Sequence, residues 1–224
     1  MDNNTELNSK NLAPGRRKYK CDHSYFNQID SEDKAYWLGF IMADGNLTSG
    51  KQKVLTICLS VKDKQQLTNL LASLKSNHRI YEYDYKTPVA MIRIDSPEIH
   101  QALVFHGCPP KKTHLLKFPS LPNHLERHFI RGYLDGDGCI CNGKTNKQVV
   151  FLGTTDMLEG ISQRLPFSHN VNVTTQRNIG RLGIRLNNKR ANLLYPWLYS
   201  DANLKLIRKE RKLKEILRAT TQHA

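Results

Sequence analysis

Two aspartates, each followed by a glycine, are the residues of this chain best suited to metal chemistry. Asp44 lies near the end of the stretch 37–45, and Asp137 lies at the same point of the similar stretch 130–138. If the two carboxylates meet, they offer hard oxygen ligands of the kind that bind Mg²⁺, which serves reactions on phosphates. The simpler interpretation is that each Asp-Gly only ends a helix in a turn. Its repetition within one chain favours the metal interpretation.

Both stretches are predicted to form helices that end at these aspartates. Each contains two small residues four positions apart, Gly39 with Ala43 and Gly132 with Gly136. Residues at that spacing share a helix face, so each helix has a flat strip on which another backbone can lie close. We therefore predict that the two helices pack through these four residues. Each aspartate would then lie at the negative end of a helix dipole beside a like charge, which favours a bound cation.

The start of each helix has its own sequence signal. Ser31 is placed to cap the first helix, and the acidic residues Glu32 and Asp33 favour its positive end. Asn123 and Glu126 are placed to do the same for the second helix.

The two stretches belong to a longer internal repeat. The same separation of 93 residues divides Asp44 from Asp137 and Asp63 from Asp156. Alternating hydrophobic residues predict strands and further helices in the same order after each motif helix. Two prolines in segment 118–122 prevent a continuous helix between the repeats. We predict an N-terminal arm over 1–30, a first half over 31–118, a linker over 119–123, a second half over 124–218 and a tail over 219–224.

The composition favours a polyanionic partner. The net charge is +14 and the pI about 9.6, and no apolar run is long enough to span a membrane. The N-terminus does not resemble a signal peptide. Five cysteines without a zinc-binding spacing predict free thiols in a reducing compartment. Cys139 and Cys141 lack a second pair, and His124 and His128 are expected on a solvated helix face.

One predicted strand concentrates positive charge. Segment 160–200 contains no Asp or Glu, and within it Arg181 and Arg185 alternate with Leu182 and Ile184. The arginines therefore share one face, which is free to meet phosphates and base edges. A solvated strand face is the alternative, but such faces normally mix signs. The predicted last helix, from about 204 to 218, has seven basic and two acidic side chains. A solubilising surface explains it nearly as well as a DNA contact does.

The two nine-residue stretches resemble the motif of the LAGLIDADG homing endonucleases, in the single-chain form with two motifs. The resemblance covers about residues 31 to 217. It implies an α+β fold of two pseudo-symmetric αββαββα halves, with the motif helices at the interface and two antiparallel sheets forming a DNA-binding saddle. The implied activity is phosphodiester hydrolysis by a site-specific endonuclease. It would make a Mg²⁺-dependent double-strand break in a long DNA target, encoded in an intron or by a free-standing mobile element.

The resemblance also assigns site residues. The metal-binding acid of the family is the eighth motif position, and the family usually adds a basic residue beside each metal. The predicted catalytic residues are Asp44, Asp137, Lys112 and Lys209. The predicted metal site, for two or three Mg²⁺ ions that Mn²⁺ can replace, comprises Asp44, Asp137, Gly45 and Gly138. The residues predicted to contact DNA are Arg93, Arg177, Arg181, Arg185, Lys51, Lys53 and Lys147.

The sequence departs from the family pattern at the end of the first long strand of each half. Relatives often carry a glutamine there, whereas this chain has Val61 and Thr154. Asp135 stands inside the second motif helix but aligns with Met42, so we exclude it from the metal site and expect it to be dispensable for cleavage.

Double-stranded DNA is the predicted partner, with intron RNA as a second candidate. The chain is expected to act as a monomer, away from membranes, in the cytoplasm, an organelle or a phage-infected host cell. One alternative is an RNA maturase or DNA-binding regulator on the same scaffold without cleavage. Another is an unrelated basic α+β binding protein. The presence of both acids favours the nuclease.

Overall fold

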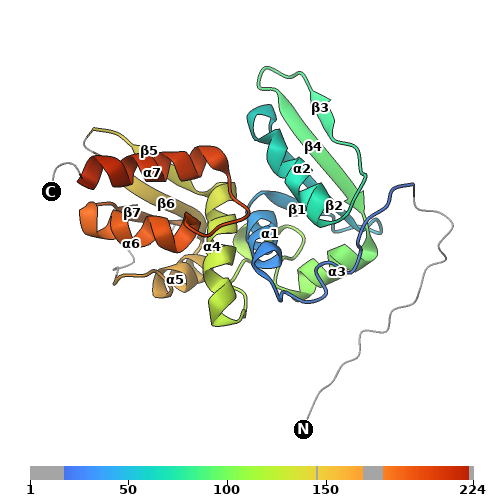
Figure 1. The fold of residues 1–224 in the computed structure, drawn as a ribbon. Helices are drawn as coiled ribbons and strands as arrows, with labels where there is room; N and C mark the ends of the chain where they lie inside the picture. Colours follow the sequence, from blue (N-terminus) through green and yellow to red (C-terminus); the bar gives the residue numbers. More distant parts are fainter. Residues whose placement is uncertain (1–17, 145, 169–178, 222–224) are drawn as a thin grey trace, which may run out of the picture.

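The computed structural model describes residues 18–144, 146–168 and 179–221. Two antiparallel sheets lie on either side of a central pair of helices (Figure 1). The predicted α+β fold class is confirmed. No helix among the described residues combines the length and apolar character that crossing a bilayer requires.

The central pair consists of α1 (Glu32–Asp44) and α4 (Asn123–Asp137). Each motif helix continues directly into the first strand of its own half, so both helices end between the two sheets (Figure 1). Ser31 caps α1 as predicted, because its side chain accepts a hydrogen bond from the Lys34 amide.

The predicted cap of α4 is wrong. Pro122 occupies the cap position and has no side-chain acceptor, while Asn123 is already the first helical residue. The Pro122 carbonyl accepts from the Leu125 amide at 2.8 Å. Glu126 instead forms an ion pair with Arg164 Nε at 2.6 Å. Glu126 lies in the first turn of α4, as the sequence predicts, and its partner Arg164 is the residue that follows the end of α5.

The N-terminal sheet has the strand order β1-β2-β4-β3, with every neighbouring pair antiparallel. Its apolar side chains alternate along the strands and are covered by helices α2 and α3. The strands are β1 (Gly45–Leu47), β2 (Val54–Ser60), β3 (Tyr81–Tyr83) and β4 (Val89–Asp95). The helices are α2 (Lys64–Ser73), which follows the 3-10 turn η2 (Val61–Asp63), and α3 (Pro97–Phe105), followed by the 3-10 turn η3 (Lys112–His114).

The described C-terminal sheet has the order β5-β6-β7 and the same antiparallel pairing. Its strands are β5 (Cys139–Asn142), β6 (Lys147–Thr154) and β7 (Ile179–Arg185). Its helices are α5 (Thr155–Gln163), α6 (Asn188–Tyr199) and α7 (Ile207–Thr221). Helix α7 starts later than the predicted residue 204, because the Leu206 amide bonds to Asp135 and the Leu206 carbonyl accepts from Lys209 and Glu210.

Helices α1 and α4 approach each other backbone to backbone. A Cβ added at Gly132 would overlap the Tyr36 carbonyl oxygen and lie 2.8 Å from its carbon. A Cβ at Gly39 would overlap the Phe129 carbonyl oxygen and lie 2.9 Å from the Tyr133 amide nitrogen. Only glycine fits at either position, since a backbone carbonyl cannot move aside as a flexible side chain can.

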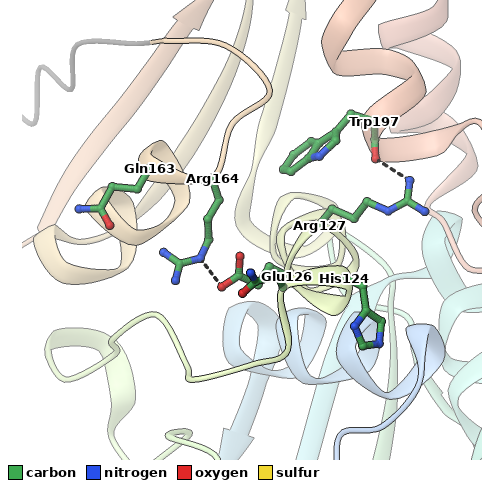
Figure 2. A pocket seen from close by; sticks show the side chains of 7 residues that line it. His124, Glu126, Arg127, Gln163, Arg164 and Trp197 are labelled. Carbon is green, nitrogen blue, oxygen red and sulfur yellow. Dashed lines mark hydrogen bonds and ion pairs between the residues drawn. The ribbon is translucent and has the colours of Figure 1, made fainter.

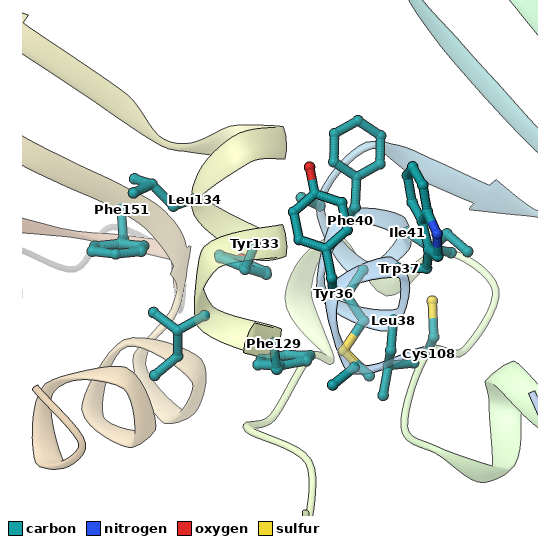
Figure 3. Packing of buried hydrophobic residues seen from close by; sticks show 14 of the residues in the cluster. Tyr36, Trp37, Leu38, Phe40, Ile41, Cys108, Phe129, Tyr133, Leu134 and Phe151 are labelled. Atoms are coloured by element: carbon teal, nitrogen blue, oxygen red, sulfur yellow. The ribbon is translucent and has the colours of Figure 1, made fainter. Parts of the chain in front are cut away.

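The hydrophobic core runs through this helix pair into both halves. Figure 3 shows Tyr36 and Phe40 on α1 facing Phe129 and Tyr133 on α4, and these residues belong to one buried cluster. The segment before α1 docks on the same core, since the Phe26 side chain is fully buried.

Candidate active site at the paired helix ends

The close helix contact brings Asp44 to the end of α4. A Cβ at Gly136 would overlap that of Ala43 and lie 3.3 Å from Asp44 Oδ2. Asp137 is the last residue of α4 and is exposed, whereas Asp44 is half-buried. The two acids of the repeated motif therefore occupy one region but have different access to solvent.

Negative charge accumulates at this end of the helix pair. Burial and, to a lesser extent, the nearby Asp137 carboxylate raise the pKa of Asp44 to about 6, although Lys209 and Lys112 oppose the shift. A carboxylate that resists ionisation in this way would be relieved by a cation, because a positive ion favours its charged form. The electrostatics therefore suit a divalent cation.

Two lysines donate hydrogen bonds to the carbonyl groups at the C-terminal ends of the motif helices. Lys209 Nζ donates to the carbonyls of Leu134, Asp135 and Gly136, each at 2.7 Å. Lys112 Nζ donates to the Ala43 carbonyl at 2.6 Å. The Leu134 carbonyl also accepts from the Gly138 amide at 3.0 Å, so Lys209 adds a second hydrogen bond there and pairs with the carbonyls of Asp135 and Gly136. Both ammonium groups balance the negative ends of the helix dipoles.

The two lysines differ in their surroundings. Lys209 is only 4% exposed, and burial lowers its pKa to about 8. Its three N–H groups are all used on carbonyls, so no donor is left for another ligand. Lys112 is half-buried and makes one such bond, which leaves two donors.

Sequence reasoning missed the role of Asp135. This fully buried carboxylate accepts hydrogen bonds from Tyr36 Oη on α1 at 3.0 Å and from Tyr199 Oη on α6 at 2.7 Å. It also accepts from the Leu206 amide at 2.7 Å, which fixes the start of α7 and thereby the lysine three residues later. Burial raises the pKa of Asp135 to about 6 despite these bonds. The sequence did carry a signal of this role, because Asp135 is an acidic residue among the apolar positions of the motif helix.

The residues at the strand ends are not metal ligands in this geometry. Thr154 is buried, caps α5 by accepting from the Met157 amide at 3.2 Å, and donates to the Leu116 carbonyl. Val61 lies in the 3-10 turn η2. Within the described segments, no group of three or more His, Cys, Asp or Glu side chains could hold a metal. The site therefore offers paired carboxylates and backbone carbonyls.

His128 does not lie on a solvated face, so that expectation is wrong. It is buried beside Arg131, which donates to its Nδ1 at 3.0 Å, and burial and Arg131 lower its pKa to about 4.

The Sγ atoms of Cys139 and Cys141 lie 3.7 Å apart on β5.

The predicted DNA-contact residues fall on strands and hairpins. Arg181 and Arg185 are exposed on β7, while Leu182 and Ile184 between them are fully buried. Arg93 is exposed on β4 and donates to Gln52 Oε1 at 3.2 Å. Lys51 is exposed. Lys53 directly precedes β2 and Lys147 is the first residue of β6, and both are half-buried. Arg177 lies outside the described residues.

A surface hollow lies at the opposite end of α4. Figure 2 shows its lining, which includes Glu126, Arg127, Arg164 and Trp197. The start of a helix as long as α4 is about 20 Å from its end. The Glu126–Arg164 ion pair and the bond from Arg127 to the Trp197 carbonyl use much of its polar lining. The hollow is therefore separate from the two aspartates.

No family model matches the sequence. Among curated proteins, the chain is 25% identical over 149 residues to the replication factor C small subunit of Methanocaldococcus jannaschii. That similarity covers 65% of this chain and 8% of the relative, so the chain spans less than a tenth of the relative's length.

Solved structures identify the class of fold. The LAGLIDADG homing endonuclease I-LtrWI bound to target DNA matches with TM-score 0.57 and 14% identity, over 89% of this chain and 92% of that chain. I-DmoI in complex with DNA and Ca matches with TM-score 0.56 and 17% identity, over 87% of this chain and 99% of that chain. Full-length DUF199/WhiA from Thermatoga maritima matches with TM-score 0.59 and 19% identity, over 91% of this chain and 65% of that one. The chain therefore has the fold of the LAGLIDADG homing endonucleases, which DUF199/WhiA shares.

Proposed function

We propose that this protein is a site-specific DNA endonuclease of the LAGLIDADG type that makes a double-strand break with Mg²⁺. The observation that carries the proposal is the pairing of Asp44 and Asp137 at two helix ends, between two sheets with open faces. The net charge of +14 and the fold shared with DNA-bound nucleases support it. Residence in a mobile element, and contact with its intron RNA, belong to the same proposal.

The residues at the helix ends fit a divalent metal. Asp44 carries an unfavourable charge that a cation would stabilise, and Asp137 adds a second oxygen donor. We assign Asp44 and Asp137 as ligands of two or three Mg²⁺ ions, with the carbonyls of Gly45 and Gly138 beside them and Mn²⁺ as a substitute. A divalent ion held by these residues would supply a more acidic water molecule and positive charge beside the phosphate.

The chain's own groups have separate tasks in this proposal. Lys112 keeps free donors next to Asp44, so it can orient the attacking water or stabilise charge that develops on the phosphate. Lys209 acts as a positioning residue, because all of its donors hold the end of α4 that carries Asp137. Since one chain supplies both acids and both sheets, the active unit is a monomer.

The test needs no knowledge of the target. Supercoiled plasmids that carry a randomised insert are incubated with the protein and Mg²⁺, and linear products are recovered and sequenced. We expect one family of inserts to be linearised. Chelator, or Asp44→Asn with Asp137→Asn, should abolish linearisation. If no insert is cut in Mg²⁺ or Mn²⁺ while DNA still binds, the nuclease proposal is wrong.

A second candidate is sequence-specific DNA binding without cleavage. Two observations favour it: the described residues include no group of three or more His, Cys, Asp or Glu side chains that could hold a metal, and the fold is also similar to that of DUF199/WhiA. The same plasmid library separates the two candidates, since a regulator would retain one family of inserts on a filter and linearise none.

A further inference from the structure

Two cysteines lie side by side on the first strand of the C-terminal sheet. Cys139 is exposed and Cys141 is half-buried, whereas Ile140 between them is only 2% exposed and belongs to the hydrophobic core. Since successive side chains of a strand point to opposite faces, both thiols point away from the core, onto the open face of the sheet. Their Sγ atoms are 3.7 Å apart. The two thiols are therefore in contact on a surface that small reagents can reach.

This thiol pair lies beside the candidate active site. Helix α4 ends at Asp137, and only Gly138 separates that acid from Cys139 at the start of β5. A chemical change at the two cysteines therefore acts on the chain directly after a proposed metal ligand.

The pair is confined to one copy of the internal repeat. The separation of 93 residues places Asn46 and Thr48 of the first half at the positions of Cys139 and Cys141. Asn46 is exposed on β1, as Cys139 is on β5. Because neither of these first-half residues is a thiol, thiol chemistry acts at the end of α4 and not at the end of α1.

Two thiols at this spacing suit a disulfide better than a bound metal. Structural zinc sites use four protein ligands, and the described residues include no group of three or more His, Cys, Asp or Glu that could hold a metal. A disulfide needs only two residues, with Cα atoms usually about 4.4–6.8 Å apart. Residues two positions apart on a strand are about 6.4–6.8 Å apart, at the long end of that range. The bond is therefore within reach if β5 shortens.

Shortening of β5 would act on the end of α4. The Gly138 amide donates to the Leu134 carbonyl at 3.0 Å and completes the last turn of that helix. Helix α7 packs along β5, and Lys212 Nζ donates to the Ile140 carbonyl at 3.4 Å. Because these contacts hold the strand to α7, the contraction is taken up at Gly138, where the strand joins α4.

We propose that Cys139 and Cys141 are an oxidation site that controls the end of α4. One cysteine attacks a low-molecular-weight disulfide such as glutathione disulfide, which forms a mixed disulfide and releases one glutathione thiol. The other cysteine then attacks the mixed disulfide, closes the bond between Cys139 and Cys141, and releases the second glutathione thiol. The two cysteines lose two electrons and two protons, which glutathione disulfide gains.

The disulfide changes the position of Asp137. Closure shortens β5 by up to about 1 Å, and a misplacement of that size can slow catalysis by roughly 100-fold. The oxidised protein therefore cleaves DNA slowly until a thiol reductant reopens the bond. This effect on cleavage rests on the proposed nuclease function, whereas the disulfide and its effect on the end of α4 do not.

The first experiment maps the bond. Full-length protein carrying Cys58→Ser, which removes the exposed thiol of β2, is incubated with glutathione disulfide at about pH 8, where more of each thiol is ionised. Remaining thiols are blocked with N-ethylmaleimide, and tryptic peptides are weighed. Peptide 132–144 contains both cysteines of the pair and no other cysteine. We expect it to lose two hydrogen atoms and to carry neither maleimide nor glutathione. With Cys141→Ser added, the same peptide should retain glutathione.

The second experiment measures the effect of the bond on the fold and on cleavage. Oxidation should speed hydrogen exchange at the end of α4 and the start of β5, while the end of α1 and β1 serve as an internal reference. The single-turnover rate of cleavage should fall at least about tenfold and recover with dithiothreitol. The matched control adds Cys139→Ser and Cys141→Ser together, and it should keep its rate in glutathione disulfide.

The inference is overturned if peptide 132–144 of the parent protein forms no internal disulfide. It is also overturned if the disulfide forms but leaves hydrogen exchange at the end of α4, or the rate of an active protein, unchanged. If the reduced protein cuts no DNA, the nuclease proposal fails by itself, and peptide mass with hydrogen exchange decides the inference.

Discussion

The Asp44 carboxylate lies where folding alone would not place a charge. It is half-buried at the negative end of α1, and the like charge of Asp137 lies nearby. Each of these features destabilises the ionised form. Since the protein tolerates that cost at Asp44, a ligand that removes the cost explains the arrangement better than helix termination does.

Replacement of Asp44 by Asn should therefore stabilise the metal-free protein. The pKa of about 6 in the folded protein exceeds the ordinary value of 3.8, so the folded state binds more protons between these values. Stability conferred by the protonated form is lost as pH rises from about 4 to about 6. We expect Asp44→Asn to be more stable than wild type by about 3 kcal/mol at pH 7 and nearly equal to it at pH 4. Urea unfolding at both pH values measures this.

The matched control is Asp156→Asn, since that acid is exposed and its partner Lys117 is exposed as well. It should leave the free energy of unfolding unchanged within about 0.5 kcal/mol. Equal stabilisation by both variants would show that general charge, rather than the Asp44 site, is responsible. Asp44→Asn should also abolish double-strand cleavage while DNA affinity persists.

The two lysines should give different defects. Lys209→Met removes three hydrogen bonds at the end of α4 and takes the ammonium donor from the Asp135 and Gly136 carbonyls, while the Leu134 carbonyl keeps its bond from the Gly138 amide, so we expect it to lower the free energy of unfolding by about 2–4 kcal/mol. Lys112→Met removes one bond and should cost about 1 kcal/mol, but it should slow single-turnover cleavage with little change in DNA affinity. Thermal melts and single-turnover rates at saturating protein measure both. A slow but fully stable Lys209→Met protein would assign that lysine to the chemical step.

At the scale of elements, the helix pair holds the site together through backbone contact. Gly132 and Gly39 allow each helix to lie against the carbonyl groups of the other, and this contact sets where both aspartates lie. Side-chain packing alone would leave the helices farther apart, since interaxial distances are usually 8–10 Å.

Gly132→Ala should disrupt this contact, because the added methyl group would overlap the Tyr36 carbonyl. We expect a loss of about 3 kcal/mol or more in the free energy of unfolding, with reduced cleavage in the protein that stays folded. Gly50→Ala is the control, because a Cβ there meets nothing within 4 Å. If the two variants unfold at the same urea concentration, the helices do not approach as closely as described.

The glycine spacing, the strand alternation and the repeat were readable from sequence because each is a pattern of residue types that requires no knowledge of tertiary contacts. The positions of Lys209 and Asp135 as helix-end and inter-helix partners were not readable. Both depend on where the start of α7 meets the end of α4, a contact between residues 74 apart in the chain. The ion pair of Glu126 with Arg164 was not readable for the same reason, because Arg164 follows the end of α5 and meets α4 only in the folded chain.

At the scale of the whole molecule, the two halves share one core and are also joined by polar contacts, one of them buried. Arg131 of α4 is fully buried and donates to Glu32 of α1 at 2.7 Å. Arg208 of α7 forms an ion pair with Asp63 at 2.7 Å across the same boundary. Because a buried cluster of side chains runs through both halves, they should unfold as one cooperative unit.

The chain carries a reporter for each half, which makes this expectation testable. Its two tryptophans are Trp37 on α1 and Trp197 on α6. Trp197→Phe leaves fluorescence from the first half, and Trp37→Phe leaves fluorescence from the second. In each background, Glu32→Gln leaves the buried Arg131 charge without its carboxylate, so we expect a loss of about 2–3 kcal/mol.

The fluorescence midpoint in urea should shift by the same amount in both tryptophan backgrounds, because Glu32 and Arg131 belong to different halves. Glu82→Gln provides a matched control, since its ion pair with Lys64 is exposed and lies within the first half. That pair should contribute less than about 1 kcal/mol. A shift by Glu32→Gln in the Trp37 signal alone would mean that the halves unfold separately. The joined helix ends would then depend on DNA or metal, rather than on the folded protein itself, for their alignment.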